Sequence, residues 1–285
     1  MSTFYQQMFT CAMCGKESEH MVMGSTSAFG AMDLDTRPPA LERHTIGTWV
    51  QACPHCGYAY YNISDKSTVD PAFLQSEEYK AAGGLDMDEL AKCFYREATI
   101  HAKCGEPDAT FSCYLHAAWA CDDAHKPEAA IACRLKALEV LQNASSFMDE
   151  NTATIMQMDL LRRTNQFNKV LEFRDKQLPN SFVQSLLEYE IKLAEAKDAR
   201  CHTVDDAEEI EEPLTAINDI PVGTKLTIKN IAELFSGAAA EEAAEDLEDA
   251  DEEDAEDVIA IVTKMIPAGT IIDDDNIDLY CTAIY

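Results

Sequence analysis

Residues 49–57 read Trp-Val-Gln-Ala-Cys-Pro-His-Cys-Gly, and they contain the second of two Cys-x-x-Cys-Gly motifs. The first motif, Cys-Ala-Met-Cys-Gly, begins 42 residues earlier at Cys11. In each motif a tight turn directs two thiolates at one ion, and the Gly that follows permits the positive φ of such a turn. The sequence therefore predicts a zinc-ribbon domain over residues 1–70, with one Zn²⁺ bound by Cys11, Cys14, Cys53 and Cys56.

Four thiolates fill the coordination sphere of zinc and leave no position for a substrate. We therefore expect a structural ion that stabilises a small domain. The alternative is thiol-based or metal sensing by exposed thiolates. His55 lies within the second motif and could replace a cysteine as a ligand, but a residue at that place in the turn usually points outward.

Length and composition are those of a globular protein with two or three domains: 285 residues, 47% of them hydrophobic. The first residues lack a basic start followed by an apolar run, and no apolar stretch approaches the length of a membrane span. These features predict a soluble cytoplasmic protein without a membrane partner. Eleven cysteines are then expected to be reduced.

The formal charge of −30 is unevenly distributed. Residues 203–257 hold 20 Asp or Glu and only two Lys or Arg. Because binding to nucleic acid depends on basic residues that neutralise phosphates, this balance argues against a nucleic-acid partner.

Apolar residues recur at helical spacing between residues 71 and 202, which predicts a helical-repeat domain there. The strongest segments are 87–104, 108–122, 128–141, 166–174 and 182–199. An acidic linker is expected at 203–214, followed by a small module at 215–285 that contains an acidic, disordered loop at 238–257. The predicted fold class is multi-domain and mainly α.

The C-terminal module contains an internal repeat. Ile220-Pro-Val-Gly-Thr recurs as Ile266-Pro-Ala-Gly-Thr, 46 residues later. Ile-Pro-x-Gly forms a turn, and the residues that follow alternate as in a strand. This module is therefore expected to be β-rich.

The segment between the two cysteine motifs contains Ala28-Phe-Gly and then Asp33-Leu-Asp-Thr-Arg-Pro-Pro. Together with both motifs, it resembles a bacterial family described only as a domain of unknown function, over about Phe9 to Arg200. The resemblance implies a zinc ribbon followed by helices like those of tetratricopeptide repeats, and it implies no activity. The Ile-Pro-x-Gly-Thr pair resembles the SAF, or antifreeze-like, domain, which implies a β-clip-like fold.

Asp33, Asp35 and Arg37 are the candidate ligand-binding residues outside the ribbon. They have two interpretations. The aspartates can cap a turn while Arg37 clamps a carboxylate and locks the segment onto the ribbon, or the three side chains can line a ligand pocket beside the helices.

Three Cys/His pairs have spacings that place two ligands on one helix face: His101 with Cys104, Cys113 with His116, and Cys121 with His125. A second metal site is one interpretation, and buried cysteines packed as small apolar residues are the other. A cluster of basic residues is also a candidate surface patch, one that could contact the acidic loop: Arg162, Arg163, Lys169, Arg174 and Lys176.

No catalytic residue set stands out, and we find no phosphate-binding Gly loop and no metal site with an open position. The sequence therefore favours a non-catalytic scaffold protein that binds a protein or peptide partner in a helical groove. The alternatives are an enzyme or small-ligand binder that uses the Asp33/Asp35/Arg37 segment, or a thiol or metal sensor. The sequence does not specify the partner or the oligomeric state.

Overall fold

The computed structural model describes residues 2–84, 86–143, 147–208, 214–236, 258–272 and 277–283. Contacts divide the chain into two compact units, Met1–Glu208 and Glu209–Tyr285. The chain is mainly α-helical with small sheets, as the sequence predicts. Among the helices in these ranges, none has the length and apolar character needed to cross a bilayer.

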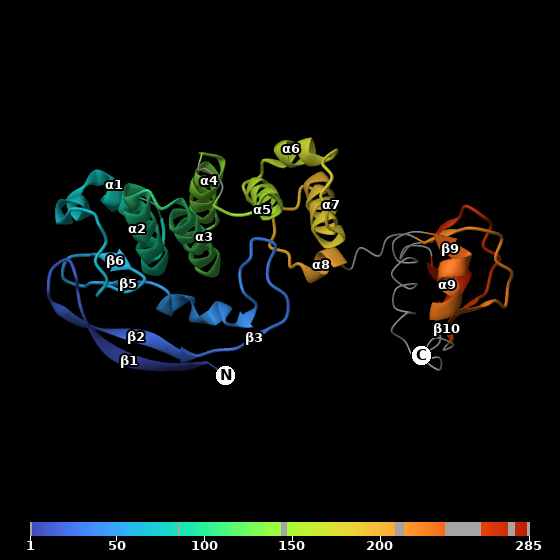
Figure 1. The fold of residues 1–285 in the computed structure, drawn as a ribbon, viewed down its shortest axis with the longest axis horizontal. Helices are drawn as coiled ribbons and strands as arrows, with labels where there is room; N and C mark the ends of the chain where they lie inside the picture. The colour runs from blue at the N-terminus through green and yellow to red at the C-terminus, as the bar shows by residue number, and fades with distance from the viewer. Residues whose placement is uncertain are drawn as a thin grey trace. The chain divides into compact units, whose positions relative to one another are not determined.

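Two antiparallel hairpins carry the cysteine motifs at the N-terminal end of the first unit (Figure 1). The long hairpin pairs β1 (Thr3–Thr10) with β2 (Glu17–Ser25), and the first motif forms the connection between them. The short hairpin pairs β5 (Gln51–Ala52) with β6 (Ala59–Tyr60) around the second motif. Between the hairpins lie β3 (Ala28–Phe29), its partner β4 (Ala40–Leu41) and the 3₁₀ helix η1 (Arg43–Thr48).

Helices follow from residue 71 onward. They are η2 (Pro71–Gln75), α1 (Glu77–Lys80), η3 (Ala81–Gly84), α2 (Glu89–Cys104), α3 (Pro107–Asp123), α4 (Pro127–Asn143), α5 (Glu150–Arg163), α6 (Phe167–Val170), η4 (Leu171–Phe173), α7 (Ser181–Glu195) and α8 (Asp205–Glu208). Side-chain caps begin several of them: Asp88 accepts from the Ala91 amide at the start of α2, and Asn180 from the Val183 amide at the start of α7. Short connections join α2 to α3 and α3 to α4, so each pair packs as a helical hairpin.

The helix boundaries differ from the predicted ones mainly at the end of the first unit. The last long helix ends at Glu195, before the predicted Ala199, because the chain turns at Lys197, whose φ is +56°. Residues 203–208, which the sequence analysis assigns to a linker, fold onto the first unit: Thr203 forms a β-bridge with Asp33, and α8 packs on α7.

The second unit contains β7 (Leu214–Ala216), β8 (Lys225–Thr227), α9 (Ile228–Leu234), β9 (Phe235–Ser236), β10 (Val258–Val262), β11 (Ile271–Ile272), α11 (Ile277–Tyr280) and β12 (Cys281–Ala283). In its described part, the strands form two antiparallel sheets, with orders β12-β10-β8 and β11-β7-β9. The predicted acidic loop at 238–257 lies wholly outside the described residues.

The sequence repeat is also a structural repeat. Adding 46 to the residue numbers of β7, β9 and the first two residues of β8 gives residues of β10, β12 and β11. The two sheets therefore correspond, and each contains one strand from the other half. The buried residues of the unit match in the same way: Ala216 with Val262, Ile220 with Ile266, Leu226 with Ile272, and Phe235 with Cys281. The Ile220–Ile266 β-bridge joins the two equivalent turns.

Candidate metal centre and junction pocket

The two Cys-x-x-Cys-Gly motifs form equivalent tight turns. In the first, the Gly15 amide donates to the Cys11 carbonyl at 2.8 Å; in the second, the Gly57 amide donates to the Cys53 carbonyl at 2.9 Å. The φ angles of Gly15 and Gly57 are +71° and +77°, in the region that favours glycine. Each turn therefore presents its two cysteines on one side.

The four predicted ligand sulfurs meet at one point. The Cys11 and Cys56 sulfurs lie 3.7 Å apart, as do those of Cys14 and Cys53, and all four lie within 4.8 Å of one another. A tetrahedron with zinc–sulfur bonds of about 2.3 Å has sulfur–sulfur edges of about 3.8 Å. The cluster therefore has the size of a tetrahedral four-thiolate metal site, and it can hold a metal ion.

The metal centre is part of the core that joins the hairpins to the helices. Cys11 and Cys53 are buried in a cluster with Tyr58 from the second hairpin and Ile100 from α2. The Tyr79 hydroxyl of α1 donates to the Gly57 carbonyl at 2.7 Å and accepts from the Ala59 amide at 2.9 Å. Hydrogen bonds to α1 thus fix the position of the second Cys-x-x-Cys-Gly motif.

His55 is directed away from the sulfurs. It is exposed, and its ring Nε2 contacts the Glu17 carbonyl oxygen at 3.2 Å. The four ligand atoms therefore all come from cysteines.

Asp33, Asp35 and Arg37 are all buried, in a tight turn in which the Asp33 amide donates to the Arg37 carbonyl. Each side chain has a partner from elsewhere. Asp33 accepts from Arg43 Nη2 at 2.5 Å, Asp35 from the Trp119 indole at 2.7 Å, and Arg37 Nη2 donates to Asp123 at 2.6 Å. The Cys201 thiol also donates to Asp33.

Asp122, at the end of α3, extends this network into the helices. Arg134 donates to both of its carboxylate oxygens, at 2.5 and 3.2 Å, and Arg163 donates at 3.0 Å. Burial opposes ionisation of Asp122, but the Arg134 guanidinium outweighs it and lowers the pKa of this carboxyl. Arg134 and Arg163 also lie 3.6 and 3.9 Å from Asp35, so ion pairs join the segment between the hairpins to α3, α4 and α5.

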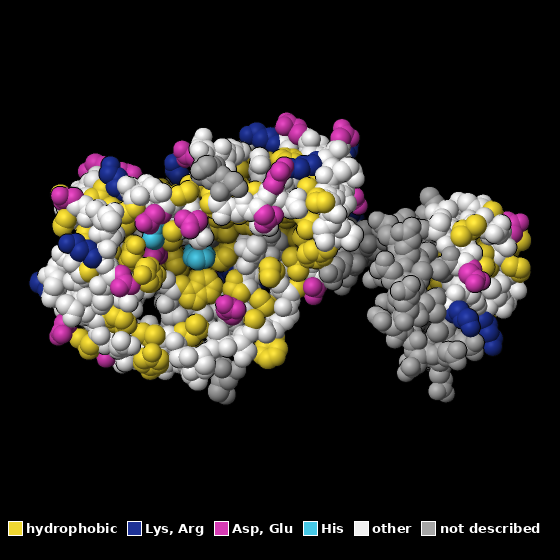
Figure 2. Space-filling view, viewed as in Figure 1, with side chains coloured by type: hydrophobic (Ala, Val, Ile, Leu, Met, Phe, Trp, Pro, Cys, Tyr) yellow, Lys and Arg dark blue, Asp and Glu magenta, His cyan; other side chains and the backbone are white. Residues whose placement is uncertain are grey.

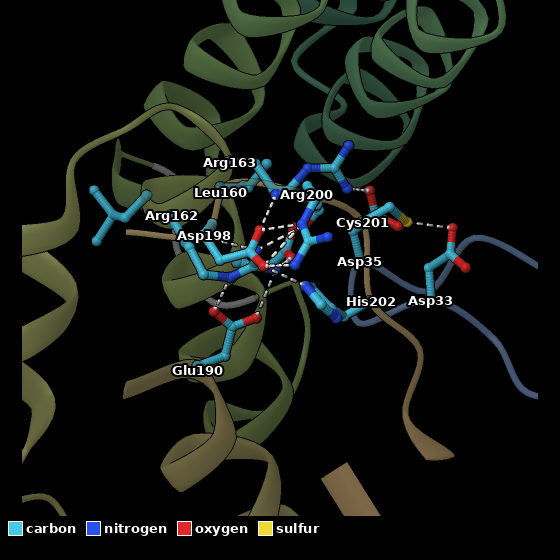
Figure 3. A network of polar contacts seen from close by, with 12 residues as sticks. Asp33, Asp35, Leu160, Arg162, Arg163, Glu190, Asp198, Arg200, Cys201 and His202 are labelled. Carbon is cyan, nitrogen blue, oxygen red and sulfur yellow. Dashed lines mark hydrogen bonds and ion pairs between the residues drawn. The ribbon is translucent and has the colours of Figure 1, made fainter. Parts of the chain in front are cut away.

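A second buried cluster lies beside the first and is centred on Arg162 (Figure 3). Its guanidinium donates to Glu190 and Asp159, each at 2.7 Å, and to the carbonyls of Asp198 and Arg200 at 3.0 and 2.7 Å. Asp198 pairs in turn with the Arg200 and His202 side chains. Arg162 therefore ties α5 to α7 and to the segment that returns toward Asp33.

These contacts correct the prediction of a basic surface patch. Arg162 and Arg163 are buried in ion pairs, whereas Lys169 and Arg174 are exposed. Sequence gives the charge of a side chain but not the acidic partners that the fold supplies.

A cavity of about 550 Å³ opens where the two clusters approach each other. It is lined by Asp33, Asp35, Arg37, Arg43, Trp119, Asp122, His125, Lys126, Pro127, Arg163, Arg200 and Cys201. The three candidate residues thus hold the segment in place and also line this cavity, but Arg37 pairs with Asp123 of α3 and not with a carboxylate of the ribbon. The sequence did not place Asp122 or Arg163 at this pocket, although each belongs to a pair of like charges at a helix end, Asp122-Asp123 and Arg162-Arg163.

None of the three predicted Cys/His pairs lies together in a group of metal-binding side chains among the described residues. Cys104 accepts from the Thr68 hydroxyl, and the His116 ring packs against Trp49 and Phe94. His125 lines the cavity. A different set comes together between α2 and α3: Glu97, His101 and Cys113.

Comparisons with family models, with curated proteins and with solved structures each found no match to this chain.

Proposed function

We propose that this chain is a non-catalytic binding protein whose junction pocket receives an anionic group, such as the carboxylate or phosphate of a small ligand. The charge of the pocket carries this proposal. Five of its lining residues are Arg or Lys and three are Asp, in a chain that has 52 acidic and 22 basic residues. Each of the five cations also pairs with a carboxylate, so it is the donors left over from these pairs that favour an anion.

The hydrogen-bonding capacity of the pocket supports the same ligand class. The carboxylate oxygens of Asp33 and Asp35 already accept from Arg43, Cys201, Trp119 and the Arg37 amide. The buried Arg37 Nε, in contrast, has no partner within the described residues. An unpaired donor in a buried cation is costly, and an anionic ligand would satisfy it.

Zinc is the metal that we propose for the four-thiolate site, in a structural role. Its closed coordination leaves no position for a substrate. The support is the tetrahedral size of the sulfur cluster and its place in the core shared with α1 and α2.

The family-level proposals follow from the arrangement of the elements. Each long helix packs mainly on its neighbours in sequence, as in tetratricopeptide repeats. The paired three-stranded sheets of the second unit support a β-clip-like, SAF-related module. We also retain the proposal of a reduced, cytoplasmic location.

Calorimetric titration of the full chain with phosphate, acetate and succinate, and with a polyamine for comparison, tests the anion proposal. We expect saturable binding of at least one anion. Arg37→Lys keeps the charge but removes the guanidinium fork, so it should weaken that binding about tenfold or more. Arg174→Lys, at an exposed ion pair, is the matched control. Saturation by no anion, or an unchanged affinity in Arg37→Lys, would show the proposal to be wrong.

Binding of a protein or peptide partner is a second candidate, favoured by exposed apolar residues. Phe4, Tyr5 and Met8 on β1 and Met21 on β2 are all exposed. The face of the first unit between the helices and this hairpin is hollowed, and apolar side chains gather there (Figure 2). Phe4, Met8 and Met21 share one face of the hairpin, because Met21 pairs with Gln6, and Tyr5 lies on the other face. An exposed apolar patch of this kind is typical of interaction sites. Peptide-array binding by the full chain, compared with Met8→Ser, tests this candidate: Met8→Ser should reduce peptide binding while the melting temperature is unchanged.

A further inference from the structure

Three metal-binding side chains meet in the interior of the first unit, apart from the four-cysteine centre. Glu97 and His101 lie four residues apart on α2 and therefore share one helix face. Cys113 lies on α3. One ligand atom from each comes within 4.8 Å of the others, and the residues are only 2%, 7% and 7% exposed.

The orientation of the His101 ring is set by a carboxylate. Its Nδ1 lies 2.6 Å from Glu106 Oε2, and because a carboxylate accepts, this contact assigns the proton of the neutral ring to Nδ1 and leaves Nε2 as the nitrogen for an ion. Metal-ligating histidines generally have such a carboxylate or carbonyl partner on the other ring nitrogen. Tyr60 stacks on the ring, with centroids 5.1 Å apart, and restricts its rotation further.

The free nitrogen faces the Glu97 carboxylate. His101 Nε2 lies 3.7 Å from Glu97 Oε1, which is too long for a hydrogen bond. It is close to the ligand–ligand edge of about 3.4 Å around one zinc ion with bonds of about 2.05 Å. The separation is therefore suited to an ion between the two side chains.

We propose that Glu97, His101 and Cys113 form a second metal site, selective for a divalent ion of the zinc type. Carboxylate oxygen, imidazole nitrogen and thiolate sulfur are together the donors of zinc sites. Three protein donors leave one position of a tetrahedron open, in contrast to the closed four-thiolate site. The ion would also link α2 to α3 next to the ribbon, because Ile100 of α2 packs in the ribbon core.

Metal content tests the proposal on the full chain, expressed in zinc-supplemented medium and dialysed against a weak chelator. We expect two zinc ions per chain in the native protein and one in Cys113→Ala. Cys133→Ala, at another buried helix cysteine, is the matched control and should retain two. Two ions that persist in Cys113→Ala would overturn the proposal, as would one ion in both proteins. One ion in the native protein that is absent from Cys113→Ala would support this site and contradict the four-thiolate one.

Cobalt spectroscopy provides a second measurement, because a titration of the native chain does not depend on whether Cys113→Ala folds. Co²⁺ added to the metal-free chain should fill two spectrally distinct sites, one with four sulfur ligands and one with a single sulfur. Glu97→Gln keeps the side-chain shape and should remove only the second component. A titration of the native chain that saturates at one equivalent with a purely four-sulfur spectrum would overturn the proposal even if the variants do not fold.

Discussion

Arg162 shows how much a single residue holds together in this fold. It is fully buried, and its donors reach two acidic side chains and two carbonyls. Removal of one partner from such a cluster leaves uncompensated buried charge, at a cost of about 3–5 kcal/mol. We therefore expect Arg162→Met to lower the free energy of unfolding by that amount in urea denaturation.

The matched control is Arg174→Met, whose ion pair with Glu195 is exposed. Exposed pairs contribute about 0–1 kcal/mol, so this variant should unfold almost like the native chain. Equal effects of the two substitutions would contradict the buried network.

Glu190 gives the same cluster a pH dependence. Burial and the nearby Asp159 raise the pKa of Glu190 to about 8, although Arg162 opposes the shift. Between pH 7 and 9 the folded chain then loses a proton that the unfolded chain, with its ordinary carboxyl pKa, has already lost. Because the native state binds more protons over this range, the free energy of unfolding should fall as the pH rises, by on the order of 1 kcal/mol.

Urea denaturation at pH 7, 8 and 9 measures this slope. Glu190→Gln has no proton to lose, so its slope should be shallower than that of the native chain. Identical slopes would mean that Glu190 does not titrate in this range.

The sequence indicated some residues of the two sites and did not indicate others. The four cysteines and the Asp33/Asp35/Arg37 set could be singled out because their spacing is unusual. Arg163 and Asp122 could not be assigned to the pocket, since they meet only after α3, α4 and α5 pack together.

At the scale of elements, the glycine that ends each Cys-x-x-Cys-Gly motif contributes to zinc affinity through its positive φ. A Cβ added at Gly57 would meet no atom within 4 Å, so the cost of Gly57→Ala comes only from its positive φ. That cost is about 1–2 kcal/mol. We expect Gly57→Ala to bind zinc about tenfold more weakly in chelator competition, without losing it.

Gly47 in η1 is the matched control, because it too has room for a Cβ but no positive φ. Gly47→Ala should leave zinc affinity unchanged. A loss of affinity in Gly47→Ala equal to that in Gly57→Ala would show that backbone conformation is not the cause.

The presence of a helix was easier to predict than its first and last residues. Segments 87–104 and 108–122 match α2 and α3 closely because each has a long apolar stripe and a Pro or Asp at its start. The helix α5 was not singled out. Its interior buries Asp159, Arg162 and Arg163, and these charges interrupt the apolar pattern that marks a helix in sequence.

For the whole molecule, removal of zinc tests whether the two units fold independently, because the metal centre lies in the core of the first unit. Residues of the ribbon, α1 and α2 share that core, whereas the second unit has a core of its own. Chelation should therefore increase amide hydrogen exchange in the hairpins, α1 and α2, and leave exchange in residues 214–236 and 258–272 unchanged.

Cys11→Ser, without chelator, should give the same exchange pattern as chelation. Increased exchange in the second unit under either condition would mean that the two units do not fold independently.

The internal repeat was visible in the sequence, but the exchange of strands between its halves was not. Spacing alone fits two separate halves equally well. β8 pairs with β10, and β11 pairs with β7, through contacts between the two halves. Such contacts between distant residues cannot be predicted from a local sequence pattern.

That exchange makes neither half self-sufficient. A single half produced alone would lack one strand of its sheet and the equivalent half of its core, so it could complete its fold only by binding a second copy. The second unit therefore has, within one chain, the arrangement of a symmetric dimer: each half supplies one strand to the sheet of the other.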